Sequence, residues 1–236
     1  MTKPASKATH KTTPVPKALT ERTLARAVEH VCARDRDLDR VVAEFGAPPL
    51  WARAPGFATL VHIILEQQVS LASARAAFAR LRAAVTTLTP RSFLTLDDQT
   101  LKTIGFSRQK IIYVRHLAKA INASAFDLDG LAYLPDEAAR GELLKLKGIG
   151  RWTADVYLLM ALCRPDVLPS GDLGLLVAAQ HVKQLSARPS PAELDRLGER
   201  WRPWRAVAAR ILWHYYLSTL AARRPRAALT PPAAAR

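Results

Sequence analysis

Residues 144–174, LKLKGIGRWTADVYLLMALCRPDVLPSGDLG, carry the pattern from which the fold of this chain can be predicted. Two apolar helical patterns flank the turn Gly148-Ile149-Gly150, and a lone carboxylate, Asp172, follows a break rich in Pro and Gly. Glycine tolerates positive φ and lets another backbone approach closely, while Ile149 can anchor the turn in the core. The pattern predicts two helices joined by a tight turn over residues 136–163.

The second helix of this pair offers a place for an anion. The first N–H groups of a helix have no partner within the helix, and they favour negative charge. Lys147 and Arg151 add positive charge beside the turn. A phosphate group fits this arrangement, although a plain turn between two helices would need the same glycines.

The rest of the chain predicts an all-α protein of roughly ten helices, each of about 8–18 residues. Alternating runs of strand-forming residues between hairpin turns are missing. Thr20, Ser70 and Ser107 are suited to cap the helices that follow them. Gln67 and Gln68 end a mostly apolar helix, where adjacent amides must find partners or face a ligand.

The net charge of +15 predicts a polyanionic partner. Four lysines in residues 1–20 and four arginines in residues 221–236 carry eight of these charges without any acid, so seven remain on the body. A generally basic, solvated surface is the alternative explanation. We expect residues 1–19 to be a disordered basic tail, residues 20–220 a helical domain, and residues 221–236 a second basic tail.

Several classes of protein are disfavoured. No window holds the roughly 18 uncharged apolar residues of a membrane span, and the N-terminal stretch lacks the apolar core of a secretory signal. We therefore expect a cytoplasmic protein. Cys32 and Cys163 are the only cysteines, too few for an iron–sulfur cluster, and the six histidines show no ligand spacing. The sequence thus predicts no metal site built from side chains and no cofactor.

Four segments, in order, resemble the helix-hairpin-helix (HhH-GPD) superfamily of base-excision DNA glycosylases. They are ILEQQVS, the helix IGFSRQKIIYVRHLA, the hairpin LKLKGIGRWTADVYLLMAL, and the loop LPSGDLG. With WRPWRAVAARILWHYY, the resemblance covers residues 38–217 and is strongest to the 3-methyladenine DNA glycosylase II type. It implies a two-lobed helical fold with the active-site cleft between the lobes, and double-stranded DNA as the partner of a monomer.

The resemblance also implies a pocket for an extruded base. Asp172 matches the catalytic aspartate of the family, although its place before an apolar helix also suits an N-cap. Trp213 aligns with an aromatic residue that stacks against the base. Trp152 lies near the pocket in the family, and Tyr157 or Tyr216 could join it. For each tryptophan, ordinary core packing is the alternative.

The family's contacts with the DNA backbone carry over to the hairpin. The resemblance assigns the Gly148–Gly150 turn and its neighbouring basic residues to DNA. It implies that the carbonyls of Leu146 and Ile149 can hold a monovalent cation. Gln68 lies where the family places the residue that fills the gap left by the extruded nucleotide.

Two departures from related branches bear on the reaction. Bifunctional relatives, such as endonuclease III and 8-oxoguanine glycosylase, carry a Lys two places after the second hairpin glycine, where this chain has Trp152. The iron–sulfur cysteines of the endonuclease III branch are also absent. The resemblance therefore implies a monofunctional glycosylase that removes alkylated bases of the 3-methyladenine and 7-methylguanine types. A non-catalytic helix-hairpin-helix DNA-binding protein and a glycosylase for oxidised or deaminated bases remain the alternatives.

Overall fold

The computed structural model describes residues 17–220, and every regular element in that part of the chain is helical. The α-helices are α1 (Glu21–Cys32), α2 (Arg36–Phe45), α3 (Phe57–Glu66), α4 (Leu71–Ala83), α5 (Pro90–Thr95), α6 (Asp98–Ile104), α7 (Arg108–Asn122), α8 (Asp136–Leu144), α9 (Arg151–Met160), α10 (Leu173–Val182), α11 (Pro191–Gly198) and α12 (Arg205–Tyr215). Two 3-10 turns, η1 (Gly130–Tyr133) and η2 (Glu199–Trp201), and a π-helical turn, η3 (Tyr216–Leu220), complete the set. The all-α prediction is confirmed. None of the described helices has the length and apolar character that crossing a membrane requires.

Side-chain caps explain where several helices begin. The hydroxyl of Thr20 accepts the N–H of Thr23 at the start of α1. Ser70 and Ser107 cap α4 and α7 in the same way, as the sequence predicts. The predicted tail boundary at residue 19 is wrong, because Leu19 is buried and its N–H donates to the carbonyl of Cys163 at 2.8 Å. Residues 1–16 and 221–236 of the two predicted tails lie outside the described residues.

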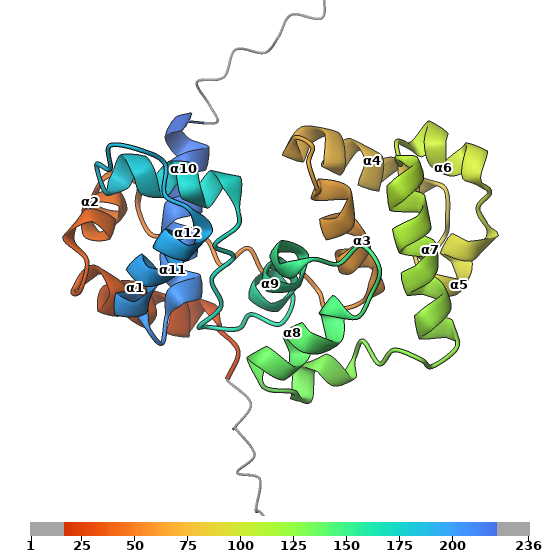
Figure 1. Ribbon diagram of the computed structural model, residues 1–236, viewed down its shortest axis with the longest axis horizontal. Coiled ribbons are helices and arrows are strands. Elements are labelled where there is room, and N and C mark those ends of the chain that lie inside the picture. Colours follow the sequence, from red (N-terminus) through yellow and green to blue (C-terminus); the bar gives the residue numbers. More distant parts are fainter. Residues whose placement is uncertain (1–16, 221–236) are drawn as a thin grey trace, which may run out of the picture.

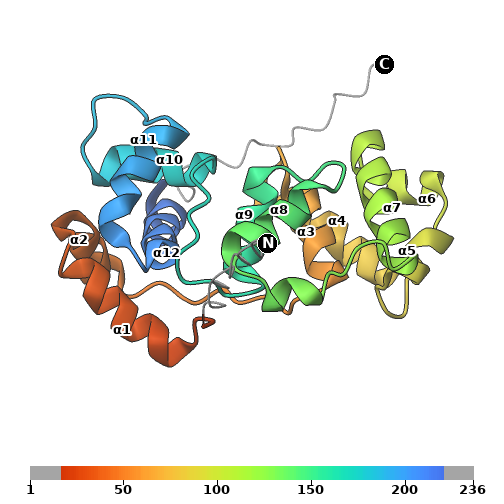
Figure 2. The same ribbon diagram turned by 60° about the horizontal axis from the view of Figure 1, so that its bottom comes forward.

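The helices form two lobes, as Figures 1 and 2 show. Helices α1, α2, α10 and α12 pack on one another in one lobe, where α11 packs on α10. Helices α3 to α7 make the other lobe, and the α8–α9 pair packs onto it through contacts between α3 and α9. In Figure 2 the α8–α9 pair lies between the two groups of helices. The chain therefore crosses between lobes twice, through residues 46–56 and residues 161–172.

The first lobe is consequently assembled from two separate parts of the chain, and a buried polar cluster joins them. Asp35, in the loop between α1 and α2, is 3% exposed. Its carboxylate accepts the indole N–H of Trp201 at 2.7 Å and forms an ion pair with Lys183 at the end of α10. Burial raises the pKa of Asp35, but hydrogen bonds from Lys183 and Trp201 more than offset this, so the pKa lies below its ordinary value.

A buried arginine connects the first lobe to the first crossover and to α9. Arg210, on α12, is 0% exposed, and its guanidinium lies among backbone carbonyls. It donates to the carbonyl of Leu50 in the first crossover at 2.8 Å and to that of Leu159 on α9 at 2.9 Å. A third N–H donates to the carbonyl of Ala206 on its own helix at 3.0 Å. Burial lowers the pKa of Arg210 to about 10.

The hairpin between α8 and α9 is closed by an aromatic ring. Gly148 adopts a φ of +85°, a conformation that L side chains rarely adopt. The ring of Tyr113, on α7, covers this glycine so closely that an added Cβ would lie 2.1 Å from the Tyr113 Cγ. Ile149 is buried and anchors the turn in the core, as predicted. The first hairpin glycine is therefore required by the packing of α7 on the turn.

Replacing Arg210 with Lys should destabilise the protein. An ammonium group is a compact charge on a flexible stem and cannot reach three carbonyls in the fork geometry of a guanidinium. We expect the free energy of unfolding to fall by about 2–3 kcal/mol, because buried carbonyls lose their donors. Urea unfolding followed by circular dichroism measures this, with exposed Arg196→Lys as the control. Equal midpoints for the two variants would contradict the role of Arg210.

Replacing Gly148 with Ala should destabilise the fold by about 3 kcal/mol, from the positive φ and the overlap with Tyr113 together. The matched control is Gly141→Ala on α8, where an added Cβ meets no atom within 4 Å. Alanine is favoured over glycine inside a helix by about 0.5–1 kcal/mol, so the control should be slightly stabilised. Thermal unfolding of both variants checks the pair, and an unshifted midpoint for Gly148→Ala would show that the Tyr113 ring can move without cost.

Candidate active site

Asp172 lies at the end of the second crossover and begins α10. Its carboxylate oxygen Oδ1 accepts the backbone N–H of Leu175 at 3.0 Å, so the residue caps α10. Two tryptophans also donate to it: the indole of Trp152 to Oδ2 at 2.7 Å and the indole of Trp213 to Oδ1 at 2.9 Å. The structure thus brings together three residues that the sequence placed in one site, from α9, α10 and α12. The capping interpretation and the site geometry hold at the same time.

Tyr216 stands beside this group. The ring of Tyr216 lies close to Gly174, where an added Cβ would be 3.4 Å from the tyrosine Cδ1 and 3.1 Å from the Asp172 Oδ1. Gly174 therefore leaves space that lets the ring approach the start of α10. Trp213 is 9% exposed, whereas Trp152 and Tyr216 are half-buried, so part of the aromatic surface around the carboxylate reaches solvent.

Tyr157 does not belong to this group, and its prediction as a pocket residue is corrected. The side chain is 0% exposed, and its hydroxyl accepts the backbone N–H of Gly56 at 3.0 Å. Burial raises the pKa of Tyr157 to about 12. Tyr157 is a core residue that ties α9 to the start of α3, because it faces α3 and not the carboxylate of Asp172.

The tip of the hairpin presents backbone and positive charge to solvent. Gly150 and Lys147 are exposed, and an added Cβ on Gly150 would meet no atom within 4 Å. The exposed Arg151 lies with its Nε 3.5 Å from the Oδ2 of Asp155, which is itself buried. Burial raises the pKa of Asp155. Its other oxygen pairs with Arg140 of α8 at 2.6 Å, which braces the two helices of the hairpin against each other.

The adjacent glutamines behave differently. The Gln67 amide donates to the carbonyl of Gly148 at 3.0 Å and to the Thr153 hydroxyl at 2.9 Å, so it fastens the end of α3 to the hairpin. Gln68 is exposed, with a φ of +56°. Lys110 holds the same turn from α7, since its ammonium donates to the carbonyls of Leu65 and Gln67 at 2.8 and 2.9 Å. Burial lowers the pKa of Lys110.

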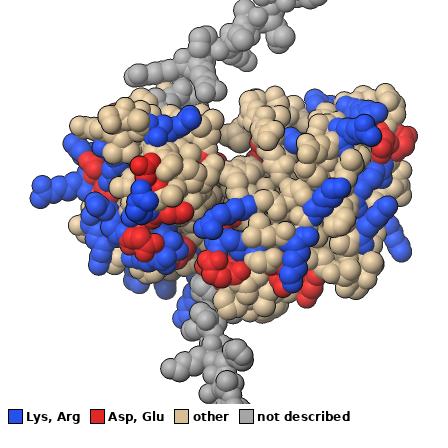
Figure 3. Space-filling model, viewed as in Figure 1, with Lys and Arg blue, Asp and Glu red and all other residues tan. Residues whose placement is uncertain are grey.

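The sequence did not predict that some apolar side chains near these elements are exposed to solvent. Leu173, the residue after Asp172, is 55% exposed. Val69 and Leu71, which follow Gln68, are also exposed. In Figure 1 the α10 helix faces α3 and α4 across a gap, and Figure 3 shows the surface hollowed there between the lobes. Apolar residues at helix ends carry no periodic signal that separates an exposed position from a buried one.

Positive charge accompanies this surface. On the face in Figure 3, Lys and Arg side chains gather over α7 and the neighbouring hairpin. No three His, Cys, Asp or Glu side chains among the described residues converge in a way that could hold a metal ion. The charged groups of this face are suited to an extended anion.

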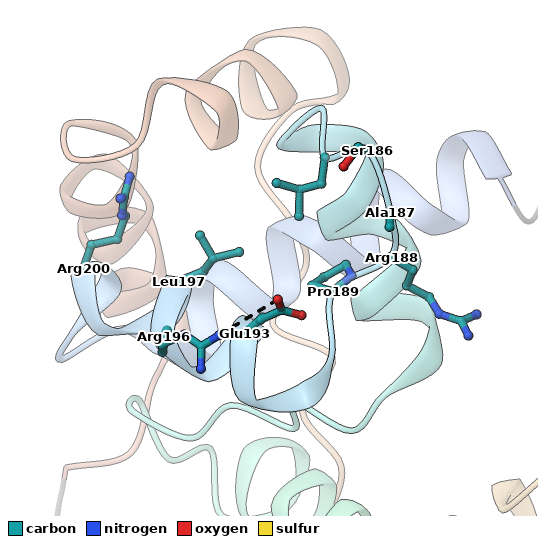
Figure 4. Close-up of a pocket in the computed structure, with 9 residues that line it drawn as sticks. Ser186, Ala187, Arg188, Pro189, Glu193, Arg196, Leu197 and Arg200 are labelled. Carbon is teal, nitrogen blue, oxygen red and sulfur yellow. Dashed lines mark ion pairs between the residues drawn. The ribbon is translucent and has the colours of Figure 1, made fainter.

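A second hollow lies at the far end of α10, between the following loop and α11 (Figure 4). It has a volume of about 430 Å³ and is lined by exposed arginines, Arg188, Arg196 and Arg200, over Leu185 and Leu197. Its one carboxylate, Glu193, is engaged by Ser190 in the cap of α11. This hollow therefore lacks a free group for chemistry, and the cluster at Asp172 is the better candidate.

Known proteins are similar to this chain in sequence. The chain is 31% identical over 126 residues to an alkylbase DNA glycosidase-like protein of Schizosaccharomyces pombe, covering 53% of this chain and 59% of that protein. It is 31% identical over 195 residues to DNA-3-methyladenine glycosylase 2 of Escherichia coli, covering 73% and 64%. The chain thus spans less than two thirds of either relative.

A solved structure gives the same fold. The S. pombe 3-methyladenine DNA glycosylase, in complex with abasic DNA, superposes with a TM-score of 0.72 at 26% identity, covering 80% of this chain and 95% of that one. The family model described as "HhH-GPD superfamily base excision DNA repair protein" matches residues 61–203, which include Trp152 and Asp172 but end before Trp213. This chain belongs to the HhH-GPD superfamily of base-excision DNA repair proteins.

Proposed function

We propose that the protein is a monofunctional DNA glycosylase that extrudes alkylated bases of the 3-methyladenine and 7-methylguanine types from duplex DNA and hydrolyses their N-glycosidic bonds. The observation that carries this proposal is the carboxylate of Asp172 held between the indoles of Trp152 and Trp213. A protein that only binds DNA has no need of a carboxylate beside aromatic rings. Relatives named as 3-methyladenine and alkylbase glycosylases support the substrate class.

The aromatic residues suit a cationic base. Alkylation of a purine ring nitrogen makes the base positively charged, and such a ring stacks well on Trp or Tyr. Trp152, Trp213 and Tyr216 surround the position that this base would take. Because the alkylated base is already a good leaving group, the reaction needs little help from a general acid and no redox cofactor.

Asp172 would then stabilise the positive charge that develops on the sugar as the base departs. A fixed carboxylate near C1′ and O4′ acts on an oxocarbenium-like transition state, as in other glycosidic cleavages. The same group can orient the attacking water. A lyase reaction would need an amine at the place of Trp152, and Lys110 is bound to two backbone carbonyls on another element.

The hairpin would hold the DNA strand while Gln68 enters the space left by the base. The exposed backbone at Gly150, with Lys147 and Arg151 beside it, suits a phosphate. The Leu146 carbonyl accepts the N–H of Ile149 at 3.1 Å, which leaves it one lone pair. The carbonyls of Leu146 and Ile149 therefore fit a monovalent cation, which would add positive charge beside that phosphate. We expect a monomer that acts on DNA inside the cell.

Replacing Asp172 with Asn should abolish base release while preserving the fold. Asn is as good an N-cap as Asp, so α10 should still form. We expect single-turnover release of 7-methylguanine from duplex DNA to slow by at least about 100-fold, because the charge that stabilises the transition state is gone. Strands are analysed before and after alkali, with 8-oxoguanine and hypoxanthine duplexes alongside. Near-normal turnover by the variant would remove Asp172 from the mechanism, and breaks before alkali in the wild type would contradict hydrolysis without lyase chemistry.

Replacing Gly150 with Ala should weaken DNA binding without changing stability. The added Cβ meets no protein atom within 4 Å and occupies the space through which a phosphate would approach. We expect the Kd for duplex DNA to rise roughly ten-fold, the effect of losing about 1–2 kcal/mol of hydrogen bonding. Fluorescence anisotropy measures this, with Gly141→Ala as the control for a glycine in open space on α8. If the Gly150→Ala variant binds duplex DNA with unchanged affinity, the DNA phosphate does not contact the hairpin at Gly150.

A further inference from the structure

The donors around Asp172 are arranged unevenly on its two oxygens. Among the described residues, Oδ1 accepts two hydrogen bonds, from the indole of Trp213 at 2.9 Å and from the backbone of Leu175 at 3.0 Å. Oδ2 accepts one, from the indole of Trp152 at 2.7 Å. A carboxylate offers about four acceptor positions, two on each oxygen. One position therefore remains open, and it is on Oδ2.

We propose that Trp152 and Trp213 are positioning residues, whose indole N–H groups fix the Asp172 carboxylate as an oriented anion with a single open acceptor position on Oδ2. This inference rests on the proposed function, in which Asp172 is the catalytic group. Hydrogen bonds to an ionised acceptor are roughly twice as strong as neutral ones, so two indoles and a backbone N–H together hold the group firmly. The sugar cation or the attacking water meets Oδ2, because Oδ1 is fully occupied.

The same two residues can hold the base without giving up the carboxylate. An indole N–H lies in the plane of its ring, so each tryptophan directs an edge at Asp172, and this contact uses neither face of the ring. A base on such a face has its glycosidic bond beside the carboxylate. Fixing the anion and the base through the same rings gives a reproducible geometry for the reaction.

The two donors also come from different lobes. Trp152 is on α9, which packs on α3, whereas Trp213 is on α12, which packs on α2 and α10. The orientation of the carboxylate therefore depends on how the lobes are set against each other. A change in the relative position of the lobes, such as closing on DNA, would therefore change the direction in which Oδ2 of Asp172 points.

The test separates holding the anion from stacking on a base by using DNA that has no base at the site. Two duplexes are compared: one carries a pyrrolidine in place of the sugar, whose ammonium mimics the sugar cation, and the other carries a neutral tetrahydrofuran. The ratio of their Kd values measures how well the carboxylate discriminates charge. Trp152→Phe and Trp213→Phe keep an aromatic face and remove the N–H. Each should reduce the ratio roughly ten-fold, the loss expected for one hydrogen bond to a charged group.

The control is Trp204→Phe, which changes a half-buried tryptophan that packs against His30 and should leave the ratio unchanged. Binding of undamaged duplex and thermal unfolding report whether each variant folds. If Trp213→Phe does not fold, Trp152→Phe still tests the inference, because the Trp152 indole donates to the other carboxylate oxygen, Oδ2.

Equal weakening of both probes, or an unchanged ratio, would overturn the inference, since the indoles would then only shape the pocket. Asp172→Asn distinguishes this result from failure of the proposed function. Loss of the charge preference in Asp172→Asn supports the catalytic role of Asp172. If Asp172→Asn keeps the preference, the proposed function fails and the positioning role fails with it.

Discussion

The guanidinium of Arg210 fixes the relation between the lobes on which the site depends. It donates to carbonyls of α9, of the first crossover and of its own helix. Burying a charge in this way is costly unless its donors are used, and here they are directed at fixed backbone oxygens. Because α9 carries Trp152 and α12 carries Trp213, the same contact joins the two helices that present the indoles. The geometry at Asp172 follows from a junction outside the site.

Asp172 combines a structural and a chemical role through one set of contacts. As the N-cap of α10 it is bound to the N–H of Leu175, so its backbone and one oxygen are fixed before any substrate arrives. The partial positive charge at the start of a helix also attracts a carboxylate placed there. An anion that is already oriented requires no rearrangement when positive charge develops nearby. The cap is thus part of what makes the carboxylate useful.

Local features of this fold could be predicted from sequence, and long-range ones could not. Caps such as Thr20 and Ser107, and the hairpin around Ile149, depend on neighbours within a few residues. The prediction for Tyr157 was wrong because two aromatic residues on one mostly buried helix, Trp152 and Tyr157, look alike in sequence, and only packing shows which one contacts the start of α3. Gln67 binds the carbonyl of Gly148, 81 residues away, and Arg210 binds that of Leu50, 160 residues away. Sequence periodicity cannot predict contacts over such separations. The resemblance supplied Trp213, whose own surroundings in the sequence suggest a core helix.

The divided lobe has a consequence for how the protein is made. The α1–α2 pair packs on α10 and α12, and the side-chain partners of the buried Asp35 include Lys183 and Trp201, which come much later in the chain. The contiguous lobe, from α3 to α9, is translated between these two parts. The ribosome adds about 5–20 residues per second, so the interval between the synthesis of α2 and that of α10 and α12 is on the order of ten seconds. Through this interval the apolar faces of α1 and α2 lack the helices that cover them in the folded protein. During that interval the nascent chain carries an incomplete hydrophobic core at its start, and one lobe can mature before the other exists.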